Sequence, residues 1–177
     1  MLKNHKKHKS LWWRDFACLV VAAFAFLLIA GVIPLIGSGL AANQAASDVI
    51  RGRFSNPDQS VTEYFEFEMA LTPDQRRNGL MFVTELPSNK GMLFVFPTEG
   101  NQIFWMKNTF ISLDMIFLDR TLKVVGVLNN VPPLNELPRH VNKPSKYVVE
   151  LAAGSARKHR IQVGSILEVA SPIPDAG

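Results

Sequence analysis

The sequence contains a single cysteine, and this scarcity restricts its chemistry. Cys18 lies inside an apolar run near the amino terminus, so the rest of the chain has no thiol. A disulfide, a cysteine-ligated structural zinc and a cysteine nucleophile are therefore excluded from the remainder. Asp15, Phe16 and Ala17 also differ from the small, apolar residues that precede a lipid-modified cysteine. We interpret Cys18 as part of a membrane-embedded segment.

The sequence also lacks the motifs of several enzyme classes. It has no Gly-x-Ser-x-Gly turn for a serine nucleophile and no glycine-rich phosphate loop. His140 and His159 stand alone rather than at the spacing of metal ligands. We therefore expect no cofactor and no metal site, and we regard an enzyme as less well supported than a non-catalytic protein.

A basic surplus is missing from most of the chain. The formal net charge of +4 comes from residues 1–15, which hold five bases and one acid, whereas residues 44–177 hold fourteen of each. A nucleic-acid-binding domain would show an excess of Lys and Arg in its folded part. We therefore expect no nucleic-acid partner.

The amino terminus has the pattern of a membrane segment. A basic region over residues 1–15 precedes an apolar run over residues 16–36, which as a helix would measure about 31 Å and cross a bilayer. The positive-inside rule leaves the basic region in the cytoplasm and the carboxy-terminal domain outside it. Cleavage near Ala41 would instead release a secreted or periplasmic protein. The membrane is thus the first expected partner.

One folded domain is expected after this segment. Residues 37–60 include a stretch rich in Ala, Ser, Asn and Gln without periodicity, which predicts a flexible linker. We place the domain at residues 61–171 and a short tail at residues 172–177.

Short strands dominate the predicted domain. Thr72-Pro73-Asp74-Gln75 is a helix start, with Gly79 near its end. A second short helix follows Gly154, and Gly126 suggests a bulge or a close backbone approach. Expected strands include residues 92–97, 115–118, 122–128, 147–151 and 166–170, and residues 129–144 form a long loop. These elements predict a mainly β fold, a compact antiparallel β-barrel or sandwich with two short helices, preceded by the N-terminal transmembrane or signal helix.

The central stretch, FWMKNTFISLDMIFLD at residues 104–119, carries the candidate site. Alternation over residues 103–108 predicts a strand covered on both faces, and Asp114 lies in an apolar row of the next strand. A carboxylate there needs a cation or hydrogen-bond donors. Lys107 lies seven residues away, across a turn.

We therefore predict one polar cluster of Lys107, Asn108, Thr109 and Asp114. The cluster has a structural interpretation, since a buried Asp often accepts hydrogen bonds from loop backbone and Lys-Asn-Thr is ordinary in turns. It also has a functional interpretation, in which Trp105 belongs to the apolar wall of a ligand pocket and the polar groups orient the ligand.

Five motifs in order give the chain a family resemblance: NGLMF at 78–82, GMLFVFP at 91–97, the central stretch at 104–119, YVVEL with a following glycine at 147–154, and VGSILEV at 163–169. Over residues 67–169 the chain resembles the bacterial and archaeal family known as domain of unknown function 192. The resemblance implies a compact, mainly β fold and often export, but no established activity.

The sequence departs from the pattern of this family at three places. Val83 stands where the family usually has arginine, and Gly164-Ser165 stands where it usually has Gly-Asp. The loop before the YVVEL strand also lacks the cysteine pair of many exported members. A redox or metal role tied to that pair would not transfer.

Three functions remain open. The first is a non-catalytic ligand-binding or accessory module of the cell envelope, with a small molecule or an envelope protein as partner. The second is an envelope hydrolase in which Asp114 is the base and Lys107 stabilises charge. The third is a purely structural or assembly partner, in which Glu150 and Lys107 form a core ion pair.

Overall fold

The domain is a single curled β-sheet with two short helices. The structure is a computed structural model, and it describes residues 49–177. The predicted membrane segment, its basic flank and the first part of the predicted linker lie outside the described residues. Among the helices of the described part, none has the length and apolar character needed to cross a bilayer.

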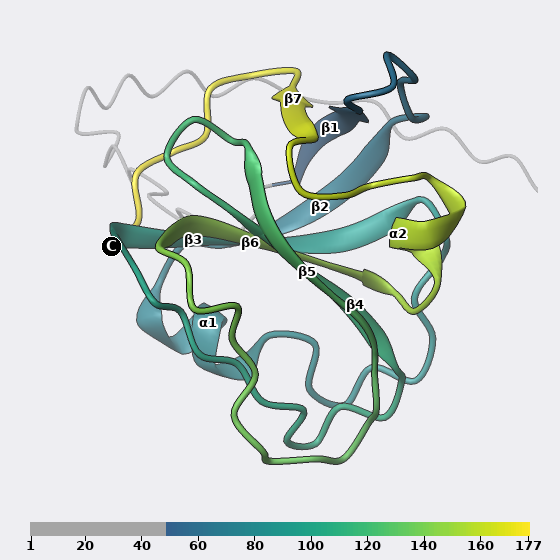
Figure 1. The fold of residues 1–177 in the computed structure, drawn as a ribbon. Coiled ribbons are helices and arrows are strands. Elements are labelled where there is room, and N and C mark those ends of the chain that lie inside the picture. The colour runs from purple at the N-terminus through teal and green to yellow at the C-terminus, as the bar shows by residue number, and fades with distance from the viewer. Residues whose placement is uncertain (1–48) are drawn as a thin grey trace, which may run out of the picture. The chain divides into compact units, whose positions relative to one another are not determined.

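The sheet has seven strands in the order β5-β4-β6-β3-β2-β1-β7 (Figure 1). The elements are β1 (Val49–Ser55), β2 (Phe65–Ala70), α1 (Pro73–Asn78), β3 (Lys90–Gly100), β4 (Leu113–Leu118), β5 (Val124–Val131), β6 (Ser145–Ala152), α2 (Ser155–Lys158) and β7 (Ile166–Val169). The mainly β class and the two short helices are confirmed.

The sheet is mixed, which corrects the prediction of an antiparallel one. β2 and β3 run parallel, with Met69 opposite Leu93, whereas every other pair of neighbouring strands is antiparallel. Parallel strands need a crossover connection, and here α1 and the loop after it supply that crossover. The helix that the sequence predicts is therefore part of the connection that allows β3 to run parallel to β2.

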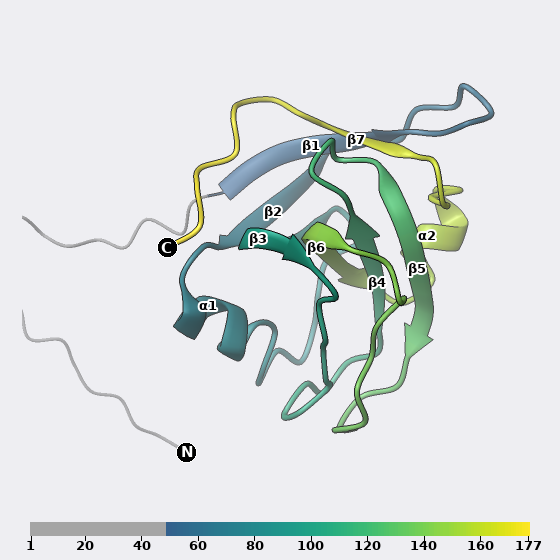
Figure 2. The same cartoon turned by 60° about the vertical axis from the view of Figure 1, so that its left-hand side comes forward.

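The sheet curls so that its two outer strands approach each other. The Val124 N–H donates to the Ser165 carbonyl (2.8 Å), and the Leu167 N–H donates to the Leu122 carbonyl (2.9 Å). These contacts lie beside a bridge between Lys123 and Ile166. The domain is thus a half-barrel made of one sheet rather than a sandwich of two (Figure 2).

The first strand begins earlier than the sequence indicates. Val49–Ser55 was predicted to belong to the linker, but it forms β1, which pairs with β2 on one side and β7 on the other. Its inward residues Ile50 and Phe54 are buried in the core. Gly52 lies between them on the same face and contributes no side chain, so the apolar alternation of this strand is interrupted in the sequence.

Each face of the sheet has its own apolar cluster. The first includes buried residues of all seven strands, among them Phe54, Phe67, Leu93 and Val149. The second covers the other face of β3, β4 and β6, where Phe94, Met115 and Val148 pack against loop residues such as Met106. Adjacent residues of β6 therefore point into different clusters, as strand geometry requires.

Two local predictions are confirmed. Thr72 caps α1 with a complete capping box, since its hydroxyl accepts the Gln75 N–H and the Gln75 side chain accepts the Thr72 N–H. The pairing of β4 and β5 is irregular near Gly126. An added Cβ at Gly126 would lie 2.7 Å from Val141, so the loop does approach the backbone closely there.

The prediction of a strand over residues 103–108 is wrong. Only Phe104 makes a bridge, to Arg139, and the chain then turns through Asn108, whose φ is 53°. The alternating pattern suggested a strand with both faces covered. In the structure the long loop 132–144 covers only one side of this segment, and Ile103 and Trp105 on the other side are exposed.

Candidate ligand-binding site

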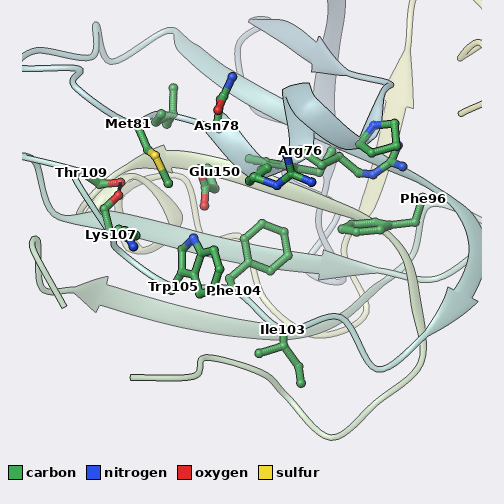
Figure 3. Close-up of a pocket in the computed structure, with 15 residues that line it drawn as sticks. Arg76, Asn78, Met81, Phe96, Ile103, Phe104, Trp105, Lys107, Thr109 and Glu150 are labelled. Atoms are coloured by element: carbon green, nitrogen blue, oxygen red, sulfur yellow. Dashed lines mark hydrogen bonds between the residues drawn. The ribbon is translucent and has the colours of Figure 1, made fainter. Parts of the chain in front are cut away.

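A cavity of about 440 Å³ lies between α1 and the segment that contains Trp105 (Figure 3). Its size falls within the usual range for small-molecule sites. The lining consists of Pro73, Arg76, Arg77, Asn78, Gly79, Leu80, Met81, Phe94, Phe96, Ile103, Phe104, Trp105, Lys107, Thr109 and Glu150. It therefore combines an apolar, aromatic wall with a few polar and charged groups.

Phe104 anchors the aromatic wall. Its ring lies edge-on to those of Phe94 (5.0 Å between centroids), Phe96 (6.1 Å) and Phe117 (5.9 Å). Such edge-to-face contacts are favourable and directional. Phe104 is also held by two backbone hydrogen bonds with Arg139 (2.9 and 2.8 Å). The aromatic wall is therefore preformed by contacts within the protein.

Glu150 lines the cavity from β6, an inner strand of the sheet between β4 and β3. Its neighbours across the sheet are Met92 on β3 and Met115 on β4, so both flanks are apolar. The residue is only 4% exposed, and within residues 49–177 its carboxyl group makes no hydrogen bond or ion pair. Burial raises the pKa of Glu150 to about 8. At neutral pH this carboxyl is therefore mostly protonated.

Three basic side chains line the same cavity. Arg76 has a structural role, because its guanidinium donates to the carbonyls of Leu71 (2.5 Å) and Val95 (2.9 Å) and lies over the Phe96 ring. The other two make exposed ion pairs, Arg77 with Asp74 (2.8 Å) and Lys107 with Glu136 (3.9 Å). Exposed pairs contribute little, so Arg77 and Lys107 can both exchange their partners for a ligand.

Three of the five predicted site residues line the cavity: Trp105, Lys107 and Thr109. Thr109 is buried, and its hydroxyl donates to the Lys107 carbonyl (3.3 Å). Asn108 lies in the adjoining turn, where its carbonyl accepts the Phe82 N–H (2.7 Å). Their role in binding stays a prediction.

Asp114 lies elsewhere, and the predicted cluster with Lys107 does not form. Its two carboxylate oxygens accept the N–H groups of Asn130 and Ala156, each at 2.8 Å. Asp114 pairs with Leu151 across the sheet, whereas Glu150 pairs with the next residue, Met115. Successive residues face opposite sides of a sheet, so Asp114 points away from the cavity.

The predicted Glu150–Lys107 ion pair is likewise not observed, because Lys107 pairs with Glu136. Glu150 lines the cavity, although the sequence pattern indicated it only as an ion-pair partner of Lys107. The available signal was a lone carboxyl group in the otherwise apolar strand YVVEL. Arg77 and Asn78 had no comparable signal, because they enter the site only through the position of α1.

Within the described residues, no group of three or more His, Cys, Asp or Glu side chains is placed to hold a metal ion. The cavity has only one carboxyl group in its lining, that of Glu150. Its chemistry is therefore that of an amphipathic pocket with one carboxyl group and several basic side chains.

The chain matches the DUF192 family, described as "Uncharacterized ACR, COG1430", over residues 55–169. It is similar to a Sinorhizobium meliloti protein, described with its crystal structure as a proposed transcription regulator, at 31% identity and a TM-score of 0.67, covering 69% of this chain and 94% of that one. A Novosphingobium aromaticivorans protein of unknown function is 28% identical, with a TM-score of 0.61, covering 68% of this chain and 84% of that one. No curated protein matches.

Proposed function

The chain belongs to the DUF192 family, and from that premise we propose that its domain is a non-catalytic ligand-binding module with Glu150 at the centre of its pocket. The unpartnered carboxyl group of Glu150 is the observation that carries the proposal. The family itself brings no activity, so the proposal depends on the geometry of this site.

Asp114 and Glu150 illustrate the difference between a structural and a binding carboxyl group. Both are buried on adjacent strands, but Asp114 has a backbone N–H on each oxygen, whereas Glu150 has none among the described residues. The Glu150 oxygens are not among the fully enclosed side-chain atoms that lack a partner, so they are open toward the cavity. Since the Glu150 carboxyl lies in a cavity, a bound molecule can supply the missing partner.

The lining indicates the class of ligand. A protonated carboxyl donates one hydrogen bond, so Glu150 suits a ligand oxygen or nitrogen that accepts it. The aromatic wall suits an apolar or aromatic body, and Lys107 and Arg77 suit an anionic group. We therefore propose a small amphipathic acid, such as an aromatic carboxylate, with an acceptor group that reaches Glu150.

We further propose that the module works at the cell envelope, held by the apolar segment over residues 16–36 with its domain outside the cytoplasm. An envelope protein is a second possible partner for an accessory module. A nucleic-acid-binding regulator would carry a basic surplus, whereas Lys and Arg only balance Asp and Glu after residue 44 of this chain.

A ligand screen on the full chain in detergent micelles tests the pocket. Aromatic carboxylates are expected to raise the melting temperature of the protein at pH 7. Glu150→Gln and Trp105→Ala are expected to remove this response, whereas Glu168→Gln, at an exposed ion pair with Arg53, keeps it. A response that all three variants retain contradicts the proposed site.

The pH dependence of binding tests the role of the Glu150 proton. If the ligand accepts the proton of a carboxyl with a pKa of about 8, affinity is constant below that pH. It then falls about tenfold per pH unit above it. Affinity that instead rises toward pH 8 means that an ionised Glu150 binds a cationic ligand, and it overturns the proposed ligand class.

One observation also favours an enzyme as second candidate. A pocket carboxyl with a pKa raised toward neutrality is typical of a general acid. A hydrolase would then use Glu150 rather than Asp114, whose oxygens are occupied and face away. Turnover of an envelope substrate that Glu150→Gln abolishes and Asp114→Asn preserves would establish this candidate in place of simple binding.

A further inference from the structure

A second feature adjoins the cavity, with which it shares Trp105, Lys107 and Thr109: it is the end of the domain where three loops meet. Backbone hydrogen bonds join them: Phe82 N–H to the Asn108 carbonyl (2.7 Å), Leu134 N–H to the Thr109 carbonyl (3.0 Å) and Met106 N–H to the Asn135 carbonyl (2.7 Å). The loops extend beyond the strand ends in both views (Figures 1 and 2). We call this region the loop end.

The loop end exposes large apolar side chains. Phe82 is 66% exposed and Leu134 is 64% exposed, and Trp105, Phe110 and Leu137 are also exposed. The Phe82 and Phe110 rings lie edge-on at 6.1 Å, so these side chains are neighbours. Single exposed apolar residues are common, whereas several on loops that are joined to one another are typical of an interaction surface.

The backbone holds these side chains outward in a costly conformation. Phe82 has a φ of 64° and Leu134 a φ of 51°, in the left-handed region that bulky residues avoid. Each is stabilised there by one of the hydrogen bonds between loops. Neither residue gains core packing in return, which indicates that presenting the side chain is itself useful.

The predicted membrane segment over residues 16–36 indicates which surface the loop end can contact. Only residues 37–48 separate the apolar run from β1. Twelve extended residues span roughly 40 Å at most, so a chain anchored by that run keeps its domain close to the bilayer. The loops also carry Lys107, Arg139 and Lys143 against Glu85 and Glu136. Aromatic and leucine tips with a slight basic surplus suit an anionic lipid surface.

We propose that the loop end is a membrane-contacting surface, which places Phe82, Phe110 and Leu134 in the interfacial layer of the bilayer to which residues 16–36 tether the chain. This proposal does not depend on a ligand in the cavity. It does depend on the sequence prediction that residues 16–36 enter a membrane.

Tryptophan quenching in the full chain provides the test. Trp105 is the only tryptophan beyond Trp12 and Trp13, so replacing those two with Phe leaves one reporter, at the loop end. The protein is reconstituted in phosphatidylcholine–phosphatidylglycerol vesicles with brominated acyl chains. Trp105 fluorescence is expected to be quenched relative to vesicles without bromine.

Matched variants locate the contact. The double variant Phe82→Ser, Leu134→Ser is expected to lose most of the quenching, whereas Val163→Ser, at an exposed apolar residue in another loop, keeps it. Absence of quenching in the parent protein overturns the proposal. Dimerisation in detergent that the double variant abolishes also overturns it, since a second copy would then be the occupant.

Discussion

Glu150 on β6 lies opposite Met92 on β3. An apolar methionine is an unusual neighbour for a carboxyl group. Apolar flanks and burial disfavour the charged form, and no donor among the described residues compensates. The consequence is a carboxyl that keeps its proton at neutral pH. This property makes the residue testable without a known ligand.

At the scale of this residue, we predict a distinctive pH dependence of stability. The folded state keeps the Glu150 proton up to about pH 8, whereas an unfolded chain releases it near the ordinary value of 4.5. Stability is therefore lost as pH rises between these values, by up to about 1.4 kcal/mol per pH unit. The Glu150→Gln variant has no such loss, so its free energy of unfolding should increase relative to that of the parent protein as the pH rises to 8.

Urea unfolding of both proteins at pH 5, 7 and 9 measures the effect, and the difference between them removes the contribution of other titrating groups. Asp114→Asn is the contrasting variant. It leaves a backbone N–H facing an amide group, so it should be destabilised at each of these pH values by about 1–3 kcal/mol. Parallel profiles for Glu150→Gln and the parent protein would show that Glu150 titrates normally.

At the scale of elements, the crossover between β2 and β3 builds one wall of the cavity. Thr72 begins α1 with its capping box, and Gly79 ends it with a φ of 47°. A Cβ at Gly79 would also lie 3.2 Å from the Phe94 ring, so the turn packs directly on the aromatic wall. The short helix therefore contributes Arg77 and Asn78 to the site because its end is held against the sheet.

Gly126 provides a prediction about the long loop on the other side of the site. A Cβ there would meet Val141 at 2.7 Å, so Gly126→Ala should push the loop away from β5. We expect a loss of about 1–3 kcal/mol in the free energy of unfolding, as for other overpacked sites. Limited proteolysis should also cut residues 132–144 faster, because they no longer pack on the strand.

Gly100→Ala is the control for this experiment. A Cβ at Gly100 would meet only the end of the Gln102 side chain, at 3.8 Å, in the same sheet. Its stability and cleavage rate should stay close to those of the parent protein. Equal behaviour of the two variants would show that the loop does not depend on its contact with Gly126.

At the scale of the whole molecule, β1 connects the two parts of the half-barrel. It lies between β2 and β7, and without it β7 keeps only its contacts with the segment around Val124. Removing β1 also takes Ile50 and Phe54 from the core. The start of the domain at residue 49 is therefore a requirement of the fold.

We predict that a fragment over residues 61–177 will not unfold cooperatively. A fragment over residues 44–177 includes β1 and should show one sharp thermal transition, while the shorter one should show a broad transition and exposed apolar surface. Circular dichroism during heating measures both. A sharp transition in the shorter fragment would mean that β1 is dispensable and that the core closes without it.

The sequence by itself determined the features that depend on neighbouring residues. The helix start at Thr72, the close approach at Gly126 and most strands of the domain follow from capping, glycine geometry and local alternation. The family and the mainly β class follow from motifs that occur in order. Trp105, Lys107 and Thr109 line the same cavity because they belong to one short segment, and their role in binding stays a prediction.

The tertiary structure alone decided which carboxyl group lacks a partner. Asp114 and Glu150 look alike in sequence, each a single acid in an apolar strand, and only the register between β4 and β6 puts them on opposite faces. The donors of Asp114 come from Asn130 and Ala156, far along the chain. The parallel pairing of β2 and β3 and the early start of β1 are also contacts between distant segments. Local patterns do not encode such pairings, so these features emerge only when the sheet is assembled.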